Sequence, residues 1–204
     1  EVSLGLSREE IILAVQNVEG IIVKSVVEVN KELFNCAPKL KFVGRAGTGL
    51  DNIDTALAKK LGIKVLNTPI ANTISAAELT IAFILSSVRR LPEVFESVKQ
   101  NDFRRIKLEG HELYGKTVGI FGIGNVGIQV FKRLLPFGCK IYGYDPGSIH
   151  LQDFIDGGGI IFNTPKDLFN KVEILSLHAN LQKGSRHILN RDTIKFLNKG
   201  SVLI

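Results

Sequence analysis

Three glycines in the stretch "KTVGIFGIGNVGIQVFKRLL" have the spacing of a dinucleotide-binding loop. Gly122, Gly124 and Gly127 follow an apolar run typical of a strand and open a pattern typical of a helix. The first glycine of such a loop permits a sharp turn, the second leaves room for a pyrophosphate, and the third lets the helix pack closely on the strand. The backbone N–H groups of Asn125 and Val126 would then face the phosphates at the positive end of the helix.

The next β-rich run, "KIYGYD", ends in Asp145, about twenty residues beyond the first glycine. A carboxylate at this place accepts hydrogen bonds from the hydroxyls of the adenosine ribose and repels a 2′-phosphate. No Arg or Lys follows Asp145 directly. The sequence therefore predicts a site for NAD in preference to NADP. The alternative is structural, because glycines fill many tight strand-to-helix turns and Asp ends many strands.

A second glycine-rich loop occurs in "RAGTGLDNID". Gly47 and Gly49 flank Thr48 directly after a predicted strand, and Arg45 adds a positive charge nearby. Successive backbone N–H groups in such a loop can bind one anion, and a carboxylate would suit it. An ordinary turn explains the two glycines equally well. For the acidic residues that follow, a structural role is favoured, with Asp54 as the N-cap of the predicted helix "TALAKKL".

Short β-rich runs alternate with helical patterns along most of the chain. Up to about residue 71, the runs "GIIVKSV", "LKFVGRA" and "IKVLN" are separated by the helical segments "SREEIILAVQNV" and "DTALAKKLG", which predicts a small α/β layer. From Lys116 onward, strands and helices alternate again, and the last of them are a helix at "RDTIKFLNK" and a strand at "SVLI". This order predicts a doubly wound parallel sheet.

Between these two regions, "TISAAELTIAFILSSVRRL" reads as a helix that is apolar on nearly every face. A membrane span is the alternative, but the uncharged run is too short for one. A helix buried between domains or subunits is favoured. The following "PEVFESVKQNDFRRIKLEGHEL" is polar and weakly helical, and could form an arm that lies on a partner.

Composition excludes several classes of protein. The 204 residues are 45% hydrophobic, enough for a folded core, and the net charge of +6 is spread along the chain. This pattern favours solvated faces that attract small anions over a nucleic-acid partner. With no apolar run of about 18 residues and no signal-like start, we expect an intracellular, cytoplasmic protein without a membrane segment. Cys36 and Cys139 are far apart and the His residues lack ligand spacing, so no metal site is expected.

The motifs together resemble one enzyme family. The segments "GRAGTGLDNID", "VLNTPIANTISAAELTIAFIL", "GHELYGKTVGIFGIGNVG", "GYDP" and "LSLHANLQKGSRHILN" are similar to those of the NAD-dependent D-2-hydroxyacid dehydrogenases. The resemblance implies a flavodoxin-like α/β substrate domain over residues 1–71 and a doubly wound (Rossmann) NAD domain over residues 72–204. It also implies a homodimer that forms through residues 73–115.

The resemblance assigns roles to individual residues. The residues that would contact NAD, besides the three glycines of the first loop, are Thr48, Asn125, Val126, Asp145, His178 and Ala179. Gly47, Thr48 and Gly49 would hold the substrate carboxylate. Lys24 and Arg45 match basic positions that favour a phosphorylated substrate. The chain departs from the usual pattern with Asn125 in place of Arg or His, Asn180 in place of Pro, and Lys24 in place of Arg.

The implied activity is NAD-dependent oxidation of a small anionic D-2-hydroxy acid, with 3-phosphoglycerate as the first candidate. The alternatives are a glyoxylate or hydroxypyruvate reductase and an NAD-sensing corepressor. The chain contains no Met and stops at "SVLI", so we expect a segment of a longer protein. The family's substrate-clamping Arg and its catalytic Glu and His would follow Ile204. No catalytic residue is therefore assigned here, and we expect the segment alone to bind NAD weakly without turnover.

Overall fold

The computed structural model describes residues 5–103, 108–180 and 185–204. The chain divides into two compact units, Glu1–Asn72 and Thr73–Ile204. The division lies one residue beyond the boundary expected from the sequence. Each unit has its own sheet and its own apolar core.

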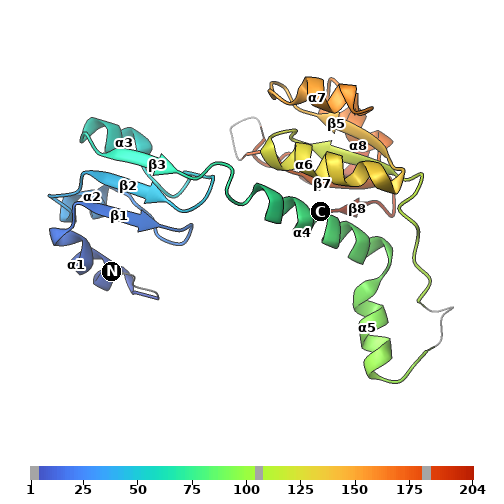
Figure 1. Cartoon of the computed structure of the whole chain (residues 1–204), viewed down its shortest axis with the longest axis horizontal. Coiled ribbons are helices and arrows are strands. Elements are labelled where there is room, and N and C mark those ends of the chain that lie inside the picture. Colours follow the sequence, from blue (N-terminus) through green and yellow to red (C-terminus); the bar gives the residue numbers. More distant parts are fainter. Residues whose placement is uncertain (1–4, 104–107, 181–184) are drawn as a thin grey trace. The chain divides into compact units, whose positions relative to one another are not determined.

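The first unit contains a parallel sheet in the order β1-β2-β3 (Figure 1). Its strands are β1 (Gly20–Val23), β2 (Phe42–Arg45) and β3 (Lys64–Asn67). Its helices are α1 (Arg8–Ala14), extended by a 3₁₀ turn at Val15–Asn17, α2 (Lys31–Cys36) and α3 (Thr55–Lys60). The consecutive strand order agrees with the consecutive part of a flavodoxin-like sheet.

Capping residues begin all three helices of this unit. The Ser7 hydroxyl accepts a hydrogen bond from the Glu10 N–H, and the Glu10 carboxylate accepts one from the Ser7 N–H, forming a capping box. Asn30 caps α2, and Asp54 caps α3 by accepting from the Leu57 N–H at 2.9 Å. The structural role predicted for Asp54 is therefore confirmed.

The second unit contains a five-stranded parallel sheet in the order β6-β5-β4-β7-β8. Its strands are β4 (Thr117–Phe121), β5 (Lys140–Tyr144), β6 (Ile160–Ile161), β7 (Ile174–Leu177) and β8 (Val202–Leu203). In order of sequence this is 3-2-1-4-5, the arrangement of the first five strands of a Rossmann sheet. The predicted α/β fold class, with its doubly wound parallel sheet, is confirmed.

Helices cover both faces of this sheet. The helices are α4 (Thr73–Val88), α5 (Leu91–Lys99), α6 (Asn125–Leu134), α7 (Leu151–Asp156) and α8 (Pro165–Lys171). One apolar cluster joins Ile120 and Ile174 of the sheet to Ile84 of α4, Phe131 of α6 and Phe154 of α7. A second cluster joins the opposite face to α8; it includes Phe121, Leu168, Phe169 and Leu175. The central strands are thus buried on both sides, as a doubly wound sheet requires.

Three details differ from the sequence prediction. The helices α2 and α7 were not predicted. The helix predicted at "RDTIKFLNK" is only a 3₁₀ turn at Ile194–Phe196. There the Asn190 side chain accepts from the N–H groups of Asp192 and Thr193, and the Thr193 hydroxyl donates to the Ile188 carbonyl. These local side-chain bonds compete with a helical backbone.

The apolar helix α4 buries one face and exposes the other. Ala77 and Ile84 are fully buried in the second unit, whereas Leu79 and Phe83 are about half exposed. Among the described residues, no helix is both long enough and apolar enough to cross a membrane. Beyond α4, α5 leads away from the sheet of this unit (Figure 1).

Candidate functional site

The loop between β4 and α6 needs its first and third glycines for steric reasons. Gly122 has a φ of +94°, and a Cβ atom there would lie 2.5 Å from the backbone nitrogen of Ala179. A Cβ atom on Gly127 would lie 2.1 Å from the Gly122 carbonyl oxygen. Around the position of a Gly124 Cβ, in contrast, there is nothing within 4 Å among the described residues. The second glycine therefore faces open space that a ligand can enter.

The amino end of α6 offers backbone donors to that space. The first hydrogen bond of the helical ladder runs from the Ile128 N–H to the Gly124 carbonyl, at 3.0 Å. The N–H groups of Asn125, Val126 and Gly127 precede this bond and lie at the positive end of the helix dipole. Such a helix terminus is a ready site for a phosphate.

Asp145 is fixed at the end of β5 beside this loop. Its Oδ2 accepts from the Ile123 N–H at 2.8 Å, and its Oδ1 accepts from the Gly147 N–H at 2.9 Å. Each carboxylate oxygen can accept more than one hydrogen bond. The side chain is therefore held in one orientation and can still receive the two hydroxyls of a ribose.

The end of β7 closes the other side of the loop. The His178 N–H donates to the Phe121 carbonyl at 2.7 Å, which places His178 and Ala179 against Gly122. The His178 ring nitrogen Nε2 lies 2.8 Å from the hydroxyl of Ser176, a fully buried residue. Burial lowers the pKa of His178 to about 4, so the ring is neutral near pH 7. Because β4 and β7 are neighbours at the point where the strand order reverses, this is where doubly wound sheets bind ligands.

In the first unit, the loop after β2 is the one for which the sequence predicts an anion site. Gly47 has a φ of +152°, and a Cβ there would lie 2.3 Å from a nitrogen of the Arg45 guanidinium. The loop is tied to the segment after β3, because the Thr68 N–H donates to the Gly47 carbonyl and the Asn67 side chain donates to the Thr48 carbonyl. Within the described part of the chain, the N–H groups of Thr48 and Gly49 have no hydrogen-bond partner. They can donate to an anion.

Asn52 connects the two predicted basic residues of this unit. Its carbonyl oxygen accepts from Arg45 Nε at 3.2 Å, and its amide group donates to the Lys24 carbonyl at 2.9 Å and the Val27 carbonyl at 2.6 Å. Arg45 also donates to the Ala46 carbonyl at 2.6 Å, and its guanidinium has further N–H donors. Because Val23 pairs with Arg45 across β1 and β2, Lys24 and Arg45 lie at the same edge of the sheet.

Comparison with known protein families identifies the family of this chain. The profile of the D-isomer specific 2-hydroxyacid dehydrogenase catalytic domain matches residues 1–201. The chain belongs to this family of oxidoreductases.

Similar proteins include two enzymes of the dehydrogenase family with different substrates. The chain is 37% identical to the D-3-phosphoglycerate dehydrogenase of Methanocaldococcus jannaschii over all 204 residues, which cover 39% of that enzyme. It is also 37% identical to the hydroxypyruvate reductase of Thermotoga maritima, over 98% of the chain and 63% of that enzyme. The chain thus spans less than two thirds of either relative.

A solved structure of the family shows the same fold. The D-lactate dehydrogenase of Aquifex aeolicus, solved with NAD and lactic acid, matches with a TM-score of 0.87 at 30% identity. The match covers 94% of this chain and 57% of that enzyme. For a member of this family, the open space at Gly124 and the fixed Asp145 fit a dinucleotide, since one admits a pyrophosphate and the other accepts ribose hydroxyls.

Sequence reasoning missed three polar residues that support the two loops. Asn52 holds Arg45 in the first unit, while Ser148 and His150 join the segment after β5 to the glycine-rich loop. Asn52 stands inside the quoted segment "GRAGTGLDNID", and Ser148 and His150 follow the segment "GYDP". Their residue types alone do not indicate which groups they bind. Only the folded chain brings them to the site.

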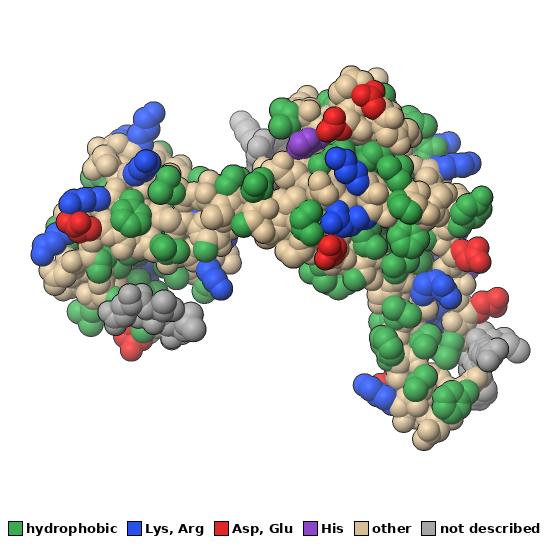
Figure 2. Space-filling view, in the orientation of Figure 1, with side chains coloured by type: hydrophobic (Ala, Val, Ile, Leu, Met, Phe, Trp, Pro, Cys, Tyr) green, Lys and Arg blue, Asp and Glu red, His purple; other side chains and the backbone are tan. Residues whose placement is uncertain are grey.

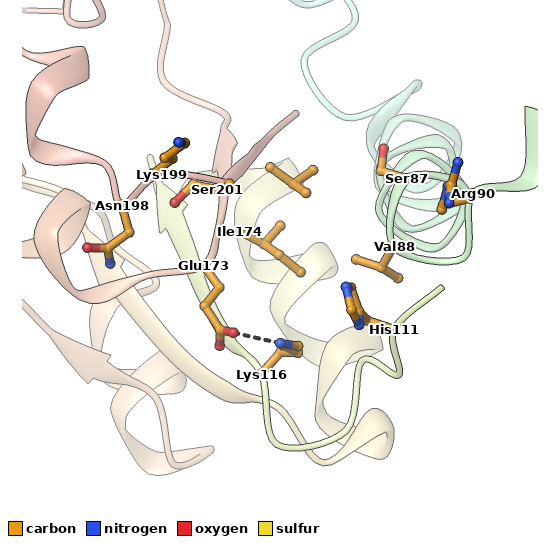
Figure 3. Close-up of a pocket in the computed structure, with 12 residues that line it drawn as sticks. Ser87, Val88, Arg90, His111, Lys116, Glu173, Ile174, Asn198, Lys199 and Ser201 are labelled. Carbon is orange, nitrogen blue, oxygen red and sulfur yellow. Dashed lines mark hydrogen bonds and ion pairs between the residues drawn. The ribbon is translucent and has the colours of Figure 1, made fainter. Parts of the chain in front are cut away.

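A pocket of about 260 Å³ lies at the opposite edge of the second sheet, at the amino ends of β7 and β8. Figure 3 shows the ion pair between Lys116 and Glu173 in its wall, with Arg90 and His111 beside α4. None of the residues that the sequence assigns to cofactor or substrate lines this pocket. Among the described residues there is also no cluster of three or more side chains suited to a metal ion.

Proposed function

We propose that this protein is an NAD-dependent dehydrogenase of D-2-hydroxy acids, and that it oxidises 3-phosphoglycerate to 3-phosphohydroxypyruvate, the entry to serine synthesis. The observation that carries the cofactor assignment is the open amino end of α6 beside a fixed Asp145. The substrate assignment is supported by the identity with a D-3-phosphoglycerate dehydrogenase over the whole chain.

In this proposal, the residues of this chain bind NAD and the hydroxy acid and orient them relative to each other. When bound, NAD supplies the acceptor for a hydride that leaves C2 of the hydroxy acid. The N–H groups of Thr48 and Gly49 would bind the substrate carboxylate, a contact that fixes the direction in which C2 points. The base that takes the hydroxyl proton is not assigned within this chain.

A phosphorylated substrate is favoured by the pair of cations in the first unit. Lys24 is exposed directly after β1, and Arg45 ends the neighbouring strand β2. Asn52 fixes the Nε side of the guanidinium, so that its remaining N–H donors keep one orientation. Two cations at one edge of a sheet suit a dianionic phosphate better than a neutral hydroxymethyl group.

The second candidate is reduction of hydroxypyruvate or glyoxylate. The hydroxypyruvate reductase of Thermotoga maritima is also 37% identical to this chain, and the chain covers a larger share of it than of the D-3-phosphoglycerate dehydrogenase. The substrates of the two candidates differ chiefly in the phosphate group. The preference between the two substrates therefore depends on whether Lys24 and Arg45 bind a phosphate.

We further propose that the protein is a homodimer that forms through residues 73–115. Of this range, residues 104–107 lie outside the described part of the chain. The support comes from exposed apolar side chains on α4 and α5, among them Phe83, Phe95 and Val98. Figure 2 shows apolar side chains on the surface of the α5 segment.

The experiment that tests the substrate measures initial rates of the full-length protein with NADH and each of three acids: 3-phosphohydroxypyruvate, hydroxypyruvate and glyoxylate. We expect the highest kcat/KM with 3-phosphohydroxypyruvate. Lys24→Gln should lower that value about tenfold, the usual effect of losing one charge-assisted hydrogen bond, and leave hydroxypyruvate nearly unaffected. Lys64→Gln, an exposed lysine at the opposite end of the sheet, is the control.

Higher kcat/KM with hydroxypyruvate or glyoxylate would move the protein to the reductases. Absence of turnover with all three acids, in a sample that binds NADH, would instead support a corepressor that senses NAD.

A further inference from the structure

Asn125, the first residue of α6, is held by a side chain from another loop. The ring nitrogen Nε2 of His150 lies 3.1 Å from the amide oxygen of Asn125. An amide oxygen can only accept a hydrogen bond, so Nε2 must carry the proton and donate it. The NH₂ group of Asn125 is then left on the other side of the amide, where it can donate to a ligand at the amino end of the helix.

His150 is itself fixed in place. Its side chain is only 23% exposed, its N–H donates to the Ser148 hydroxyl at 3.0 Å, and its carbonyl accepts from the N–H of Phe154, a fully buried residue of α7. Ser148 in turn donates to the Ile123 carbonyl in the glycine-rich loop at 2.5 Å. The segment after β5 thus holds that loop at two points in addition to Asp145.

The charged group that faces the His150 ring is a carboxylate. Asp153, in the first turn of α7, has its Oδ2 at 4.0 Å from Nδ1 of His150. Nε2 faces Asn125, and Nδ1 faces this carboxylate, so both ring nitrogens have a defined neighbour. The separation of 4.0 Å is too long for a hydrogen bond, so the ring is oriented through Nε2 and its contact with Asn125.

We propose that His150 is a positioning residue for the cofactor: it turns the side chain of Asn125 so that the amide NH₂ donates to the pyrophosphate. This inference rests on the proposed NAD site. In this arrangement an oriented amide dipole, together with the backbone N–H groups of α6, takes the place of a charged side chain at the helix terminus. Ser148 supports the arrangement through the backbone of His150.

The test uses the full-length protein and three ligands measured by titration: NADH and ADP-ribose, which contain the pyrophosphate, and adenosine, which does not. His150→Ala should raise the Kd of NADH and of ADP-ribose about fivefold, the effect of one lost hydrogen bond, and leave that of adenosine unchanged. His150→Gln, whose amide can still donate, should restore most of the affinity. Gln152→Ala, two residues beyond His150 in α7 and with a side chain hydrogen-bonded only to Asp156 among the described residues, is the matched control.

A double-mutant cycle separates positioning from a general structural effect. If His150 acts through Asn125, the double variant His150→Ala/Asn125→Ala should bind NADH no more weakly than Asn125→Ala alone. Additive losses, an equal loss for adenosine, or unchanged NADH binding by His150→Ala would each overturn the inference and leave the proposed function intact. Failure of the unaltered protein to bind NADH would overturn the proposed function itself.

Discussion

At the scale of single residues, the glycines of the loop after β4 have separate roles that substitution can distinguish. A Cβ on Gly127 would lie 2.1 Å from a backbone oxygen, a contact that requires the helix or the loop to move. A Cβ on Gly124 meets nothing within 4 Å, and its φ of −74° is open to any residue. One glycine is therefore needed by the fold, and the other only by a ligand.

We predict that Gly127→Ala lowers the free energy of unfolding by about 1–3 kcal/mol, the usual cost of overpacking, and weakens NADH binding as well. Gly124→Ala should weaken NADH binding without lowering the melting temperature, because the added methyl group occupies space meant for the pyrophosphate. Thermal unfolding and NADH titration of the two variants provide the comparison, with Gly147→Ala, also in open space, as the control. A lowered melting temperature in Gly124→Ala would contradict this division of roles.

The sequence predicts residues that belong to a motif better than residues that support one. Gly122, Gly127 and Asp145 could be found because a strand, a turn and a helix fix their spacing. His150 could not, since its role depends on where the segment after β5 returns to the glycine-rich loop. The cofactor and substrate roles themselves remain predictions, which the experiments above address.

At the scale of the elements, an ion pair joins the amino ends of β4 and β7, the two strands on either side of the point where the strand order reverses. The Glu173 carboxylate accepts from Lys116 Nζ at 2.7 Å and from the backbone N–H and the hydroxyl of Thr117. The hydrogen bond from Lys116, followed by the one from the Thr117 backbone, lowers the pKa of Glu173 below its ordinary value of 4.5. Folding therefore favours the ionised carboxylate.

A carboxyl group whose pKa is lowered by folding stabilises the protein above its unfolded pKa, and this contribution is lost as the pH falls through the folded pKa. Glu173→Gln should therefore be less stable than the unaltered protein at pH 7, and the difference should shrink below about pH 4.5. Because the Glu173 side chain is 45% exposed, we expect the free energy of unfolding of Glu173→Gln to be lower by only about 0.5–1 kcal/mol at pH 7.

Urea unfolding of both proteins at pH 7, 5.5 and 4 measures this dependence. Glu96→Gln, which removes an exposed carboxylate 3.8 Å from Lys99, is the control, and its stability should differ little from that of the unaltered protein at any pH. If Glu173→Gln loses the same stability at every pH, the contribution of Glu173 comes from its packing and neutral hydrogen bonds and not from its charge.

Periodicity predicted the strands and the long helices but not every short element. The strands of both sheets and the helices α4 and α6 have clear apolar patterns, and the structure contains them. The helices α2 and α7 are only six residues long, too short for a clear periodic signal, whereas α3, of the same length, could be predicted because its N-cap Asp54 marks its start. The false helix near Ile194 arose because the pattern ignores the side chain of Asn190, which binds the backbone that a helix would use.

At the scale of the whole molecule, the second unit carries more apolar surface on α4 and α5 than its own core uses. Phe95 is 63% exposed and Val98 is 50% exposed on α5. None of the residues of α5 is buried. The sequence could indicate that this region is apolar on too many faces for one core, but not what covers it, because that depends on a second molecule. An isolated amphipathic segment of this kind is typical of an interface.

We predict that Phe95→Asp converts the proposed homodimer into monomers. Loss of a buried aromatic anchor costs about 2 kcal/mol or more, so the dimer Kd should rise at least thirtyfold. Light scattering after size exclusion, over a range of concentrations, measures the change. The matched control is Ile155→Asp, which adds the same charge at an apolar side chain of similar exposure on α7. If Phe95→Asp stays dimeric while Ile155→Asp dissociates, the interface lies on the α7 side of the unit, and the exposed apolar face of α5 has another occupant.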